Sequence, residues 1–252
     1  MKRKLVTRSV IVLLLALSNF AFAQETADKK WQVELSATLA NKFLSPAGGI
    51  VLYPHNNVVT DIVLIHEGEK VNLGIKFSDI QSHRCTLCTE GEEIDPQGFV
   101  EFKFPRDRKL RLSYTHLFLG GEQPSDFMNP AVTYTREHDY GARFTFSAKA
   151  DAYIHTNSRG EHSGVIISLG AVAEKEVKSF AGRLKIEVGY DPLGTFNFRP
   201  RTVIWREEFG VMYLWKKTGL SFGPQAIFTG TNDPRYSGVM VVGFTFIKVF
   251  KF

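Results

Sequence analysis

Apolar and polar residues alternate one by one along much of the chain. From Ala142 to His155 every even-numbered position is alanine, phenylalanine or isoleucine, while the odd-numbered positions include Arg143, Lys149 and Asp151. Successive side chains of a β-strand point to opposite faces, so this segment predicts a strand with one apolar and one charged face. The same period recurs over 108–118 and 179–190, and helical periodicity is not evident. The pattern predicts an all-β protein.

The alternation predicts twelve strands. They span 31–41, 58–67, 70–78, 98–104, 108–118, 129–138, 141–155, 164–176, 179–190, 202–216, 219–229 and 236–249. Gaps of two or three residues alternate with gaps of six to nineteen residues. Bacterial outer-membrane barrels combine an even strand number with tight periplasmic turns and long extracellular loops. We therefore expect a transmembrane antiparallel up-and-down β-barrel of about twelve strands, with ten to fourteen possible. A water-soluble sandwich or a lipocalin-like barrel, with the apolar face inward, is the alternative.

The first 23 residues match a secretory signal peptide. Basic residues precede an apolar segment over 10–17, and Ala21-Phe22-Ala23 forms a cleavage site before Gln24. We expect residues 24–252 to form the barrel. The whole chain has 31 basic and 26 acidic residues, a net charge of +5, but four basic residues belong to this leader. The mature chain then has a net charge of +1, which argues against nucleic acid as a partner.

Aromatic residues fall at the strand ends of the apolar face, as in the interfacial girdles of membrane barrels. The residues expected in these girdles are Trp31, Phe104, Phe180, Trp215 and Phe250 at periplasmic ends, and Phe77, Phe118, Tyr190 and Trp205 at outer ends. Met240, Val242, Phe244, Phe246, Phe250 and Phe252 share one parity, and the chain ends on Phe252. A closing strand that ends in phenylalanine resembles the signal that the barrel assembly machinery reads in outer-membrane proteins. We therefore expect a Gram-negative outer-membrane location.

A narrower resemblance rests on three segments. Glu93-Ile94-Asp95 before a predicted strand, the strand from Leu110 to Phe118, and the opening strand and loop from Leu35 to Phe43 are similar to regions of TorF-type porins. The aromatic-Arg-Gly signature usual after the first strand of that family is replaced by Asn41-Lys42-Phe43-Leu44-Ser45-Pro46. The resemblance implies a channel.

The charged face of the strands is the first candidate for function. Its predicted lumen residues are Glu34, Lys76, Glu101, Lys103, Arg111, Glu137, Arg143, Lys149, Asp151, Arg183, Lys185, Glu187, Arg206 and Glu208. Charges that line a narrow water-filled pore decide which solutes pass. We expect passive passage of small hydrophilic solutes or ions, without a cofactor or a metal. Opposite charges that pair and fill the interior would instead give a closed, structural or adhesive barrel.

Cys85 and Cys88 form a C-x-x-C motif in the longest predicted loop. Because an exported chain passes through an oxidising periplasm, the motif favours a short disulfide within that loop. A metal site of His83, Cys85 and Cys88 and a redox pair are the alternatives.

His116 raises the possibility of a lipid-modifying enzyme, because it lies on the apolar face near an outer strand end. An interfacial histidine among aromatic residues is the simpler interpretation, and no enzyme activity is predicted. Arg199 and Arg201, in an outer loop, could bind the phosphates of lipopolysaccharide. Expected partners are therefore outer-membrane lipid, lipopolysaccharide, the assembly machinery and small solutes.

Overall fold

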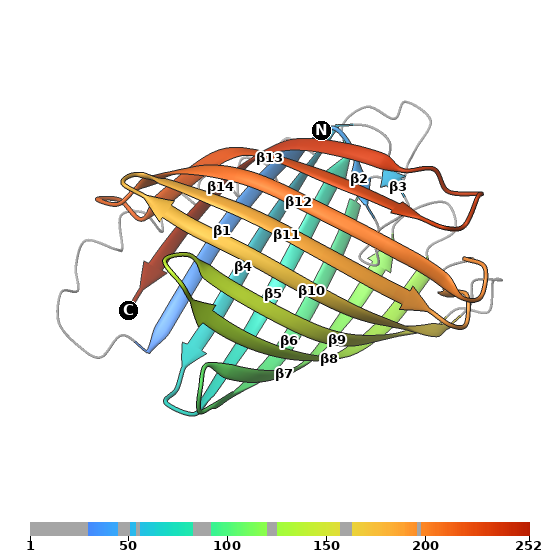
Figure 1. Cartoon of the computed structure of the whole chain (residues 1–252), viewed down its shortest axis with the longest axis horizontal. Helices are drawn as coiled ribbons and strands as arrows, with labels where there is room; N and C mark the ends of the chain where they lie inside the picture. Colours follow the sequence, from blue (N-terminus) through green and yellow to red (C-terminus); the bar gives the residue numbers. More distant parts are fainter. Residues whose placement is uncertain are drawn as a thin grey trace, which may run out of the picture.

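Twelve antiparallel strands close into a barrel in the structure, a computed structural model that describes residues 30–44, 51–53, 56–82, 92–119, 125–156, 163–195 and 198–252 (Figure 1). The strands are β1 (Trp31–Ala40), β4 (Asn57–Glu67), β5 (Val71–Ser82), β6 (Glu92–Phe104), β7 (Arg108–Leu119), β8 (Ser125–Asp139), β9 (Arg143–His155), β10 (Gly164–Val177), β11 (Phe180–Asp191), β12 (Thr202–Trp215), β13 (Leu220–Thr231) and β14 (Val239–Lys251). A short hairpin of β2 (Phe43–Leu44) and β3 (Val51–Tyr53) lies between β1 and β4. The predicted fold class and number of strands are confirmed.

The barrel closes where β1 pairs with β14 in an antiparallel ladder. Thr38 and Thr245 lie opposite each other in this ladder, and their hydroxyl oxygens are 2.9 Å apart. The backbone N–H of Trp31 donates to the carbonyl oxygen of Phe252 at 3.2 Å, and the N–H of Phe252 donates to Trp31 at 2.9 Å. Every other strand pairs with its neighbours along the chain, so this closure is the one ladder of the barrel that joins distant parts of the sequence.

The two ends of the barrel differ. At the end that we call the turn end, connections of two to four residues join the strands, and they include residues with positive φ such as Arg106 (64°), Asp107 (55°) and Gly219 (66°). The other connections are longer, and the strand ends that they join lie at the opposite end of the barrel, the loop end (Figure 1, right). The predicted segregation of short and long connections is therefore present.

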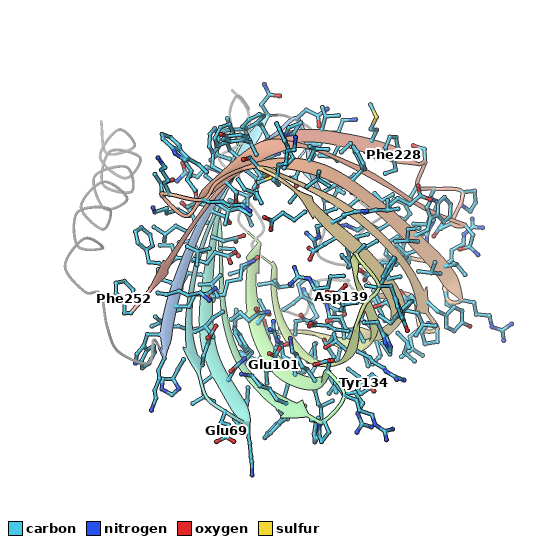
Figure 2. The ribbon with its side chains drawn as sticks, turned by 60° about the vertical axis from the view of Figure 1, so that its left-hand side comes forward. Glu69, Glu101, Tyr134, Asp139, Phe228 and Phe252 are labelled. Atoms are coloured by element: carbon cyan, nitrogen blue, oxygen red, sulfur yellow. The ribbon has the colours of Figure 1, made fainter. Side chains whose placement is uncertain are left out.

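The outward face of the barrel is predominantly apolar and the inward face is predominantly polar. Figure 2 shows Glu101 directed into the barrel, whereas Tyr134 and Phe228 lie on its outside. Tyr134 is 40% exposed and Phe228 is 46% exposed, while Glu101 is buried. Glu207 is an exception, because it lies exposed on the outward row of β12 between Trp205 and Phe209. In the part of the chain that the structure describes, no helix has the length and apolarity to span a bilayer.

Three strands extend at least four residues further toward the loop end than the sequence predicts. β6 begins at Glu92 and not at residue 98, β5 continues to Ser82, and β8 begins at Ser125. The sequence does not predict the first half of β6 because it contains Pro96 and Gly98. Proline cannot donate a hydrogen bond to a ladder, and glycine weakens a strand. The segment Glu93-Ile94-Asp95, compared above with TorF-type porins, therefore lies inside a strand and not before one.

Gly74 on β5 provides space for an aromatic ring from the next strand. A Cβ atom at this position would lie 2.1 Å from the ring of Phe99. The guanidinium of Arg111 lies 4.3 Å from the centroid of the same ring, and Arg111 also pairs with Glu101 at 2.6 Å. The glycine thus allows an aromatic ring to support the arginine of an inward-facing ion pair.

We expect Gly74→Ala to lower the free energy of unfolding by about 1–3 kcal/mol, because the methyl group overpacks the contact with Phe99. Urea unfolding in lipid vesicles measures the effect. Gly98→Ala on β6 is the matched control, since a Cβ at that glycine meets nothing within 4 Å. Equal losses in the two variants would contradict the packing explanation.

Candidate functional site

All fourteen predicted lumen residues lie on inward-facing rows of their strands, as the strand pairing shows. Most of them are paired with an opposite charge. On β9, β11 and β12 two groups of pairs line the same cavity, the isolated pair of β9 and the linked pairs of β11 and β12, and together we call them the charged ladder. Its members are Lys149, Asp151, Lys185, Glu187, Arg206 and Glu208.

Lys185 connects two carboxylates of the charged ladder. Its Nζ lies 2.6 Å from Oε2 of Glu187 and 3.4 Å from Oε1 of Glu208. Nε of Arg206 lies 2.6 Å from Oε1 of Glu208, and Nζ of Lys149 lies 2.8 Å from Oδ2 of Asp151. Because these side chains are only partly exposed, the pairs hold one another in fixed positions along the wall.

Small inward-facing residues on β10 and β11 leave space beside the charged ladder. Ser168 on β10 and Gly189 on β11 line a cavity together with the ladder residues, and Tyr153, Ile166 and Ile204 border it toward the loop end. A Cβ at Gly189 would lie 3.3 Å from Ile166, so a larger residue would narrow the cavity. The inward face here is polar and has room for water or a small solute.

Several further inward-facing charges, which are not among the predicted lumen residues, complete these pairs. Asp61 on β4 lies 3.1 Å from Nζ of Lys76 and accepts a hydrogen bond from Ser78 at 2.6 Å. Nζ of Lys109 lies 2.6 Å from Glu137. Glu174 accepts hydrogen bonds from Arg143, and its Oε1 lies 3.3 Å from Nε of Arg183. Asp61 escaped detection because apolar residues occupy both faces of β4 around it. The other two lie at strand ends, where alternation is harder to assign.

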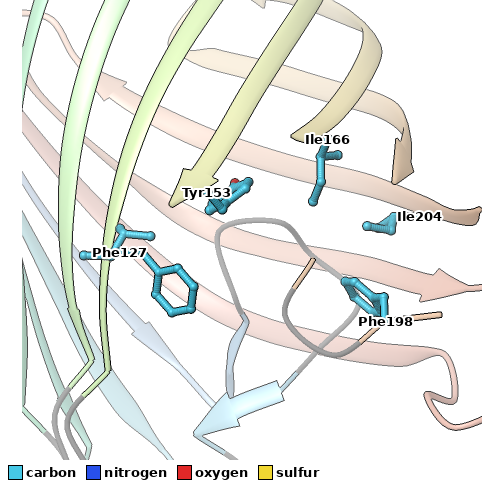
Figure 3. Packing of buried hydrophobic residues seen from close by; sticks show 6 residues of the cluster. Phe127, Tyr153, Ile166, Phe198 and Ile204 are labelled. Atoms are coloured by element: carbon cyan, nitrogen blue, oxygen red, sulfur yellow. The ribbon is translucent and has the colours of Figure 1, made fainter. Parts of the chain in front are cut away.

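An apolar cluster narrows the lumen at the loop end. This loop-end cluster consists of Leu117, Phe127, Tyr153, Ile166, Phe198 and Ile204, with Tyr236 packed against it. Phe198 comes from the connection between β11 and β12, and its ring lies among side chains of the barrel wall (Figure 3). The rings of Phe198 and Tyr236 are 5.1 Å apart in an edge-on arrangement. Loop residues therefore pack inside the barrel mouth.

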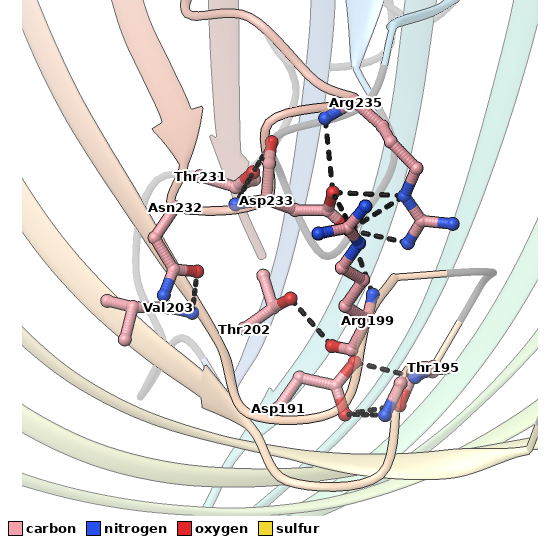
Figure 4. Close-up of polar contacts among 10 residues, drawn as sticks. Asp191, Thr195, Arg199, Thr202, Val203, Thr231, Asn232, Asp233 and Arg235 are labelled. Carbon is pink, nitrogen blue, oxygen red and sulfur yellow. Dashed lines mark hydrogen bonds and ion pairs between the residues drawn. The ribbon is translucent and has the colours of Figure 1, made fainter.

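Asp191 holds the start of the loop that carries Phe198. Its carboxylate accepts hydrogen bonds from the backbone N–H groups of Leu193 (3.1 Å), Gly194 (2.9 Å) and Thr195 (2.6 Å), and from the Thr195 hydroxyl (3.1 Å) (Figure 4). Asp191 and Thr195 are fully buried. A buried carboxylate that is satisfied in this way fixes the local backbone.

Asp233 ties the same loop to the connection between β13 and β14. It accepts from the backbone N–H of Arg199 at 2.9 Å and from Nε of Arg235 at 3.0 Å (Figure 4). The Arg235 guanidinium and these backbone donors hold the pKa of Asp233 well below its usual range. Arg199, considered above for lipopolysaccharide, thus contributes its backbone to this contact, while its side chain is exposed.

The low pKa of Asp233 predicts a pH dependence of stability. A carboxyl group whose pKa is lower in the folded than in the unfolded protein stabilises the fold above its unfolded pKa, and this contribution is lost as the pH falls. We expect the free energy of unfolding to decrease from about pH 5 to about pH 2, and to decrease less steeply in Asp233→Asn. Urea unfolding over this range measures both slopes. Identical slopes would contradict the assignment.

Most residues of the predicted girdles are exposed on the outward face. Exposed fractions of 41–54% are found for Trp31, Phe77, Phe104, Phe180, Tyr190, Trp205 and Trp215. Phe250 differs, being only 5% exposed, and Nζ of Lys248 lies 5.1 Å from its ring centroid. Phe252 is 40% exposed, and its ring stacks 6.5 Å from that of Phe250. The side chain of Phe118 lies outside the described part.

The other candidate residues are placed as follows. His116 lies half-buried on the outward row of β7, opposite Met128, with its Nδ1 3.4 Å from the hydroxyl of Tyr114. Arg201 is exposed at the loop end, with a φ of 67°. His83, Cys85, Cys88 and the predicted signal peptide lie outside the described residues. Over the described ranges, no three His, Cys, Asp or Glu side chains form a group that could hold a metal ion.

The fold resembles solved structures of outer-membrane barrels. A channel from Pseudomonas putida F1 superposes with a TM-score of 0.54 at 9% identity, covering 91% of this chain and 98% of that one. The NanC porin gives 0.55 at 8% identity (86% and 99% covered), and LpxR from Salmonella typhimurium gives 0.50 at 9% identity (87% and 100% covered). No family model and no curated protein matches the chain, so the resemblance to TorF-type porins stays a prediction. These likenesses establish the fold.

Proposed function

We propose that this protein is a channel of the bacterial outer membrane that lets small hydrophilic solutes or ions pass by diffusion. The proposal rests on one observation: the two faces of the closed sheet differ in polarity. The outside is predominantly apolar, whereas the inside carries the charged ladder and a cavity beside it. A barrel in water would have the reverse arrangement, because its apolar face would be buried.

The outward aromatic residues support a membrane position. Trp205 and Trp215 lie on the outward row of one strand, ten residues apart. At ~3.4 Å per residue and a tilt of ~40°, they are separated by about 26 Å along the barrel axis, close to the apolar band of outer-membrane barrels. With the loop end outward, Glu207 lies about 5 Å inside the outer girdle, within reach of the headgroup region.

Paired charges are compatible with a water-filled lumen. A filled interior needs side chains that meet across the barrel, but the pairs of the charged ladder join residues on the same strand or on neighbouring strands of one wall. The loop-end cluster packs a loop residue, Phe198, inside the barrel mouth. We infer that solute size is limited there and that charge selectivity arises at the ladder below it.

Planar-bilayer recording of the refolded protein tests the proposal. We expect stepwise, ohmic conductance in KCl, with solute access limited by the loop-end cluster. Heat-dependent migration on a gel provides the control that the barrel has folded. A folded barrel without conductance at any voltage would overturn the channel and leave a structural or adhesive role.

A further inference from the structure

The inward faces of β13 and β14 differ from the rest of the lumen wall. Each of the other ten strands places at least one charged residue inward, whereas the inward row of β13 contains only serine, glycine, glutamine, isoleucine and threonine. The inward row of β14 carries Val239, Val241, Gly243, Thr245, Ile247 and Val249 before Lys251 at its end. Apart from Lys251 at its end, one arc of the lumen wall is thus uncharged, and its β14 row is largely apolar.

At the turn end this arc and the adjoining end of β12 form one wall of a wide hollow. The hollow is open to the lumen, and its second wall is charged. Its apolar wall includes Met212, Leu214 and Ile247, and its charged wall includes Arg143, Glu174 and Arg183. We call this the turn-end hollow. The apolar side chains are only partly buried, so a solute can reach them.

The charged wall has a surplus of positive charge. Arg143 and Arg183 share the carboxylate of Glu174, to which Nε of Arg183 lies at 3.3 Å, and their side chains are 62% and 51% exposed. Glu176 at the rim is paired with Lys216. Two guanidinium groups that share one carboxylate retain free N–H donors for a second anion.

The remaining charges around the hollow balance this local surplus. Asp139 also borders the hollow, whereas Lys175 lies on the outward row of β10, because Glu174 and Glu176 on either side of it face inward. Counted with Lys216, the partner of Glu176, the ionisable groups that face the hollow therefore sum to zero. The two guanidinium groups form a local cationic site, and an apolar wall faces them across the hollow.

We propose that the turn-end hollow binds small amphipathic anions, molecules with an apolar body and one carboxylate or sulfonate group. The apolar body would lie on Met212, Leu214 and Ile247, while the anionic group would accept hydrogen bonds from Arg143 and Arg183. This inference rests on the proposed channel and specifies the solutes that it favours. A purely hydrophilic anion would find the same arginines but would gain nothing from the apolar wall.

Block of the KCl current by matched probes tests the inference. Benzenesulfonate and methanesulfonate carry the same charged group, and only the first has a large apolar body. We expect benzenesulfonate to halve the conductance at a concentration about tenfold lower than methanesulfonate, which corresponds to ~1.4 kcal/mol. Benzyltrimethylammonium, with the apolar body and the opposite charge, is expected to block no better than tetramethylammonium.

Two variants separate the contributions of the two walls. Ile247→Asn is expected to reduce the difference between the two sulfonates to less than about threefold, and Arg183→Gln to weaken block by both sulfonates. Val63→Asn, an equivalent change on the inward row of β4 outside the hollow, should retain the difference.

The possible outcomes distinguish this inference from the proposed function. Conductance that both sulfonates block equally would overturn the amphipathic site and leave the channel intact. A folded barrel without conductance would overturn the channel, and equilibrium dialysis of benzenesulfonate against the micellar protein would then decide the site. Saturable binding that Ile247→Asn abolishes would support the site, and equal binding by both proteins would overturn it.

Discussion

Lys185→Gln should make the channel more selective for cations, with the permeability ratio of K⁺ to Cl⁻ rising about three- to tenfold at low salt. Lys185 is the cation between Glu187 and Glu208, at 2.6 Å and 3.4 Å from their carboxylate oxygens. Its removal leaves one uncompensated negative charge on the wall of a narrow water-filled path. The reversal potential under a KCl gradient measures the change.

The control for this prediction removes a cation from the other side of the same sheet. Arg136 is exposed on the outward row of β8, so Arg136→Gln changes the net charge equally without altering the lumen. Lys185→Arg should retain the original selectivity. A shift as large in Arg136→Gln as in Lys185→Gln would show that selectivity is not set at the charged ladder.

Asp191→Ala should lower the free energy of unfolding by about 2–4 kcal/mol, which would be the largest stability effect expected here. The substitution leaves the N–H groups of Leu193, Gly194 and Thr195 without their shared acceptor in a buried region. Because this turn leads to Phe198, we also expect loss of the packing in the loop-end cluster. Urea unfolding in vesicles measures the free energy, and protease sensitivity of the loop reports its order.

Two further variants check the explanation. Asp191→Asn retains one acceptor oxygen and should lose about half as much stability as the alanine variant. Glu69→Ala removes a carboxylate from an exposed turn at the opposite end and should change stability by less than about 0.5 kcal/mol. Equal losses at Asp191 and Glu69 would contradict the role of the buried carboxylate.

The strands that the sequence predicts best are those whose two faces differ most in polarity. β9 alternates without interruption, because one face is apolar and the other carries Arg143, Lys149 and Asp151. In such a strand the type of each residue indicates the face on which it lies, so the alternation alone assigns the inward rows. Twelve strands and the fourteen inward charges followed from this property.

Strands with similar residues on both faces were harder to interpret. β4 places Val59, Val63 and Ile65 inward, so its apolar residues do not identify the outer face, and Asp61 was missed. The uncharged inward row of β14 was not recognised as a feature for the same reason. The burial of Phe198 could not be predicted either, because the loop that carries it has no periodicity and the cluster that it joins draws residues from five different strands.

The closure of β1 on β14 also determines when the protein can become a barrel. Thr38 and Thr245 pair in this ladder although most of the chain lies between them in sequence. The ladder therefore forms only after nearly all of the chain is available. Contacts between such distant residues form slowly. Until they form, the sheet has two unpaired edges that can accept a strand from another chain. During assembly, β1 must therefore be shielded from the strands of other chains until β14 is available to pair with it.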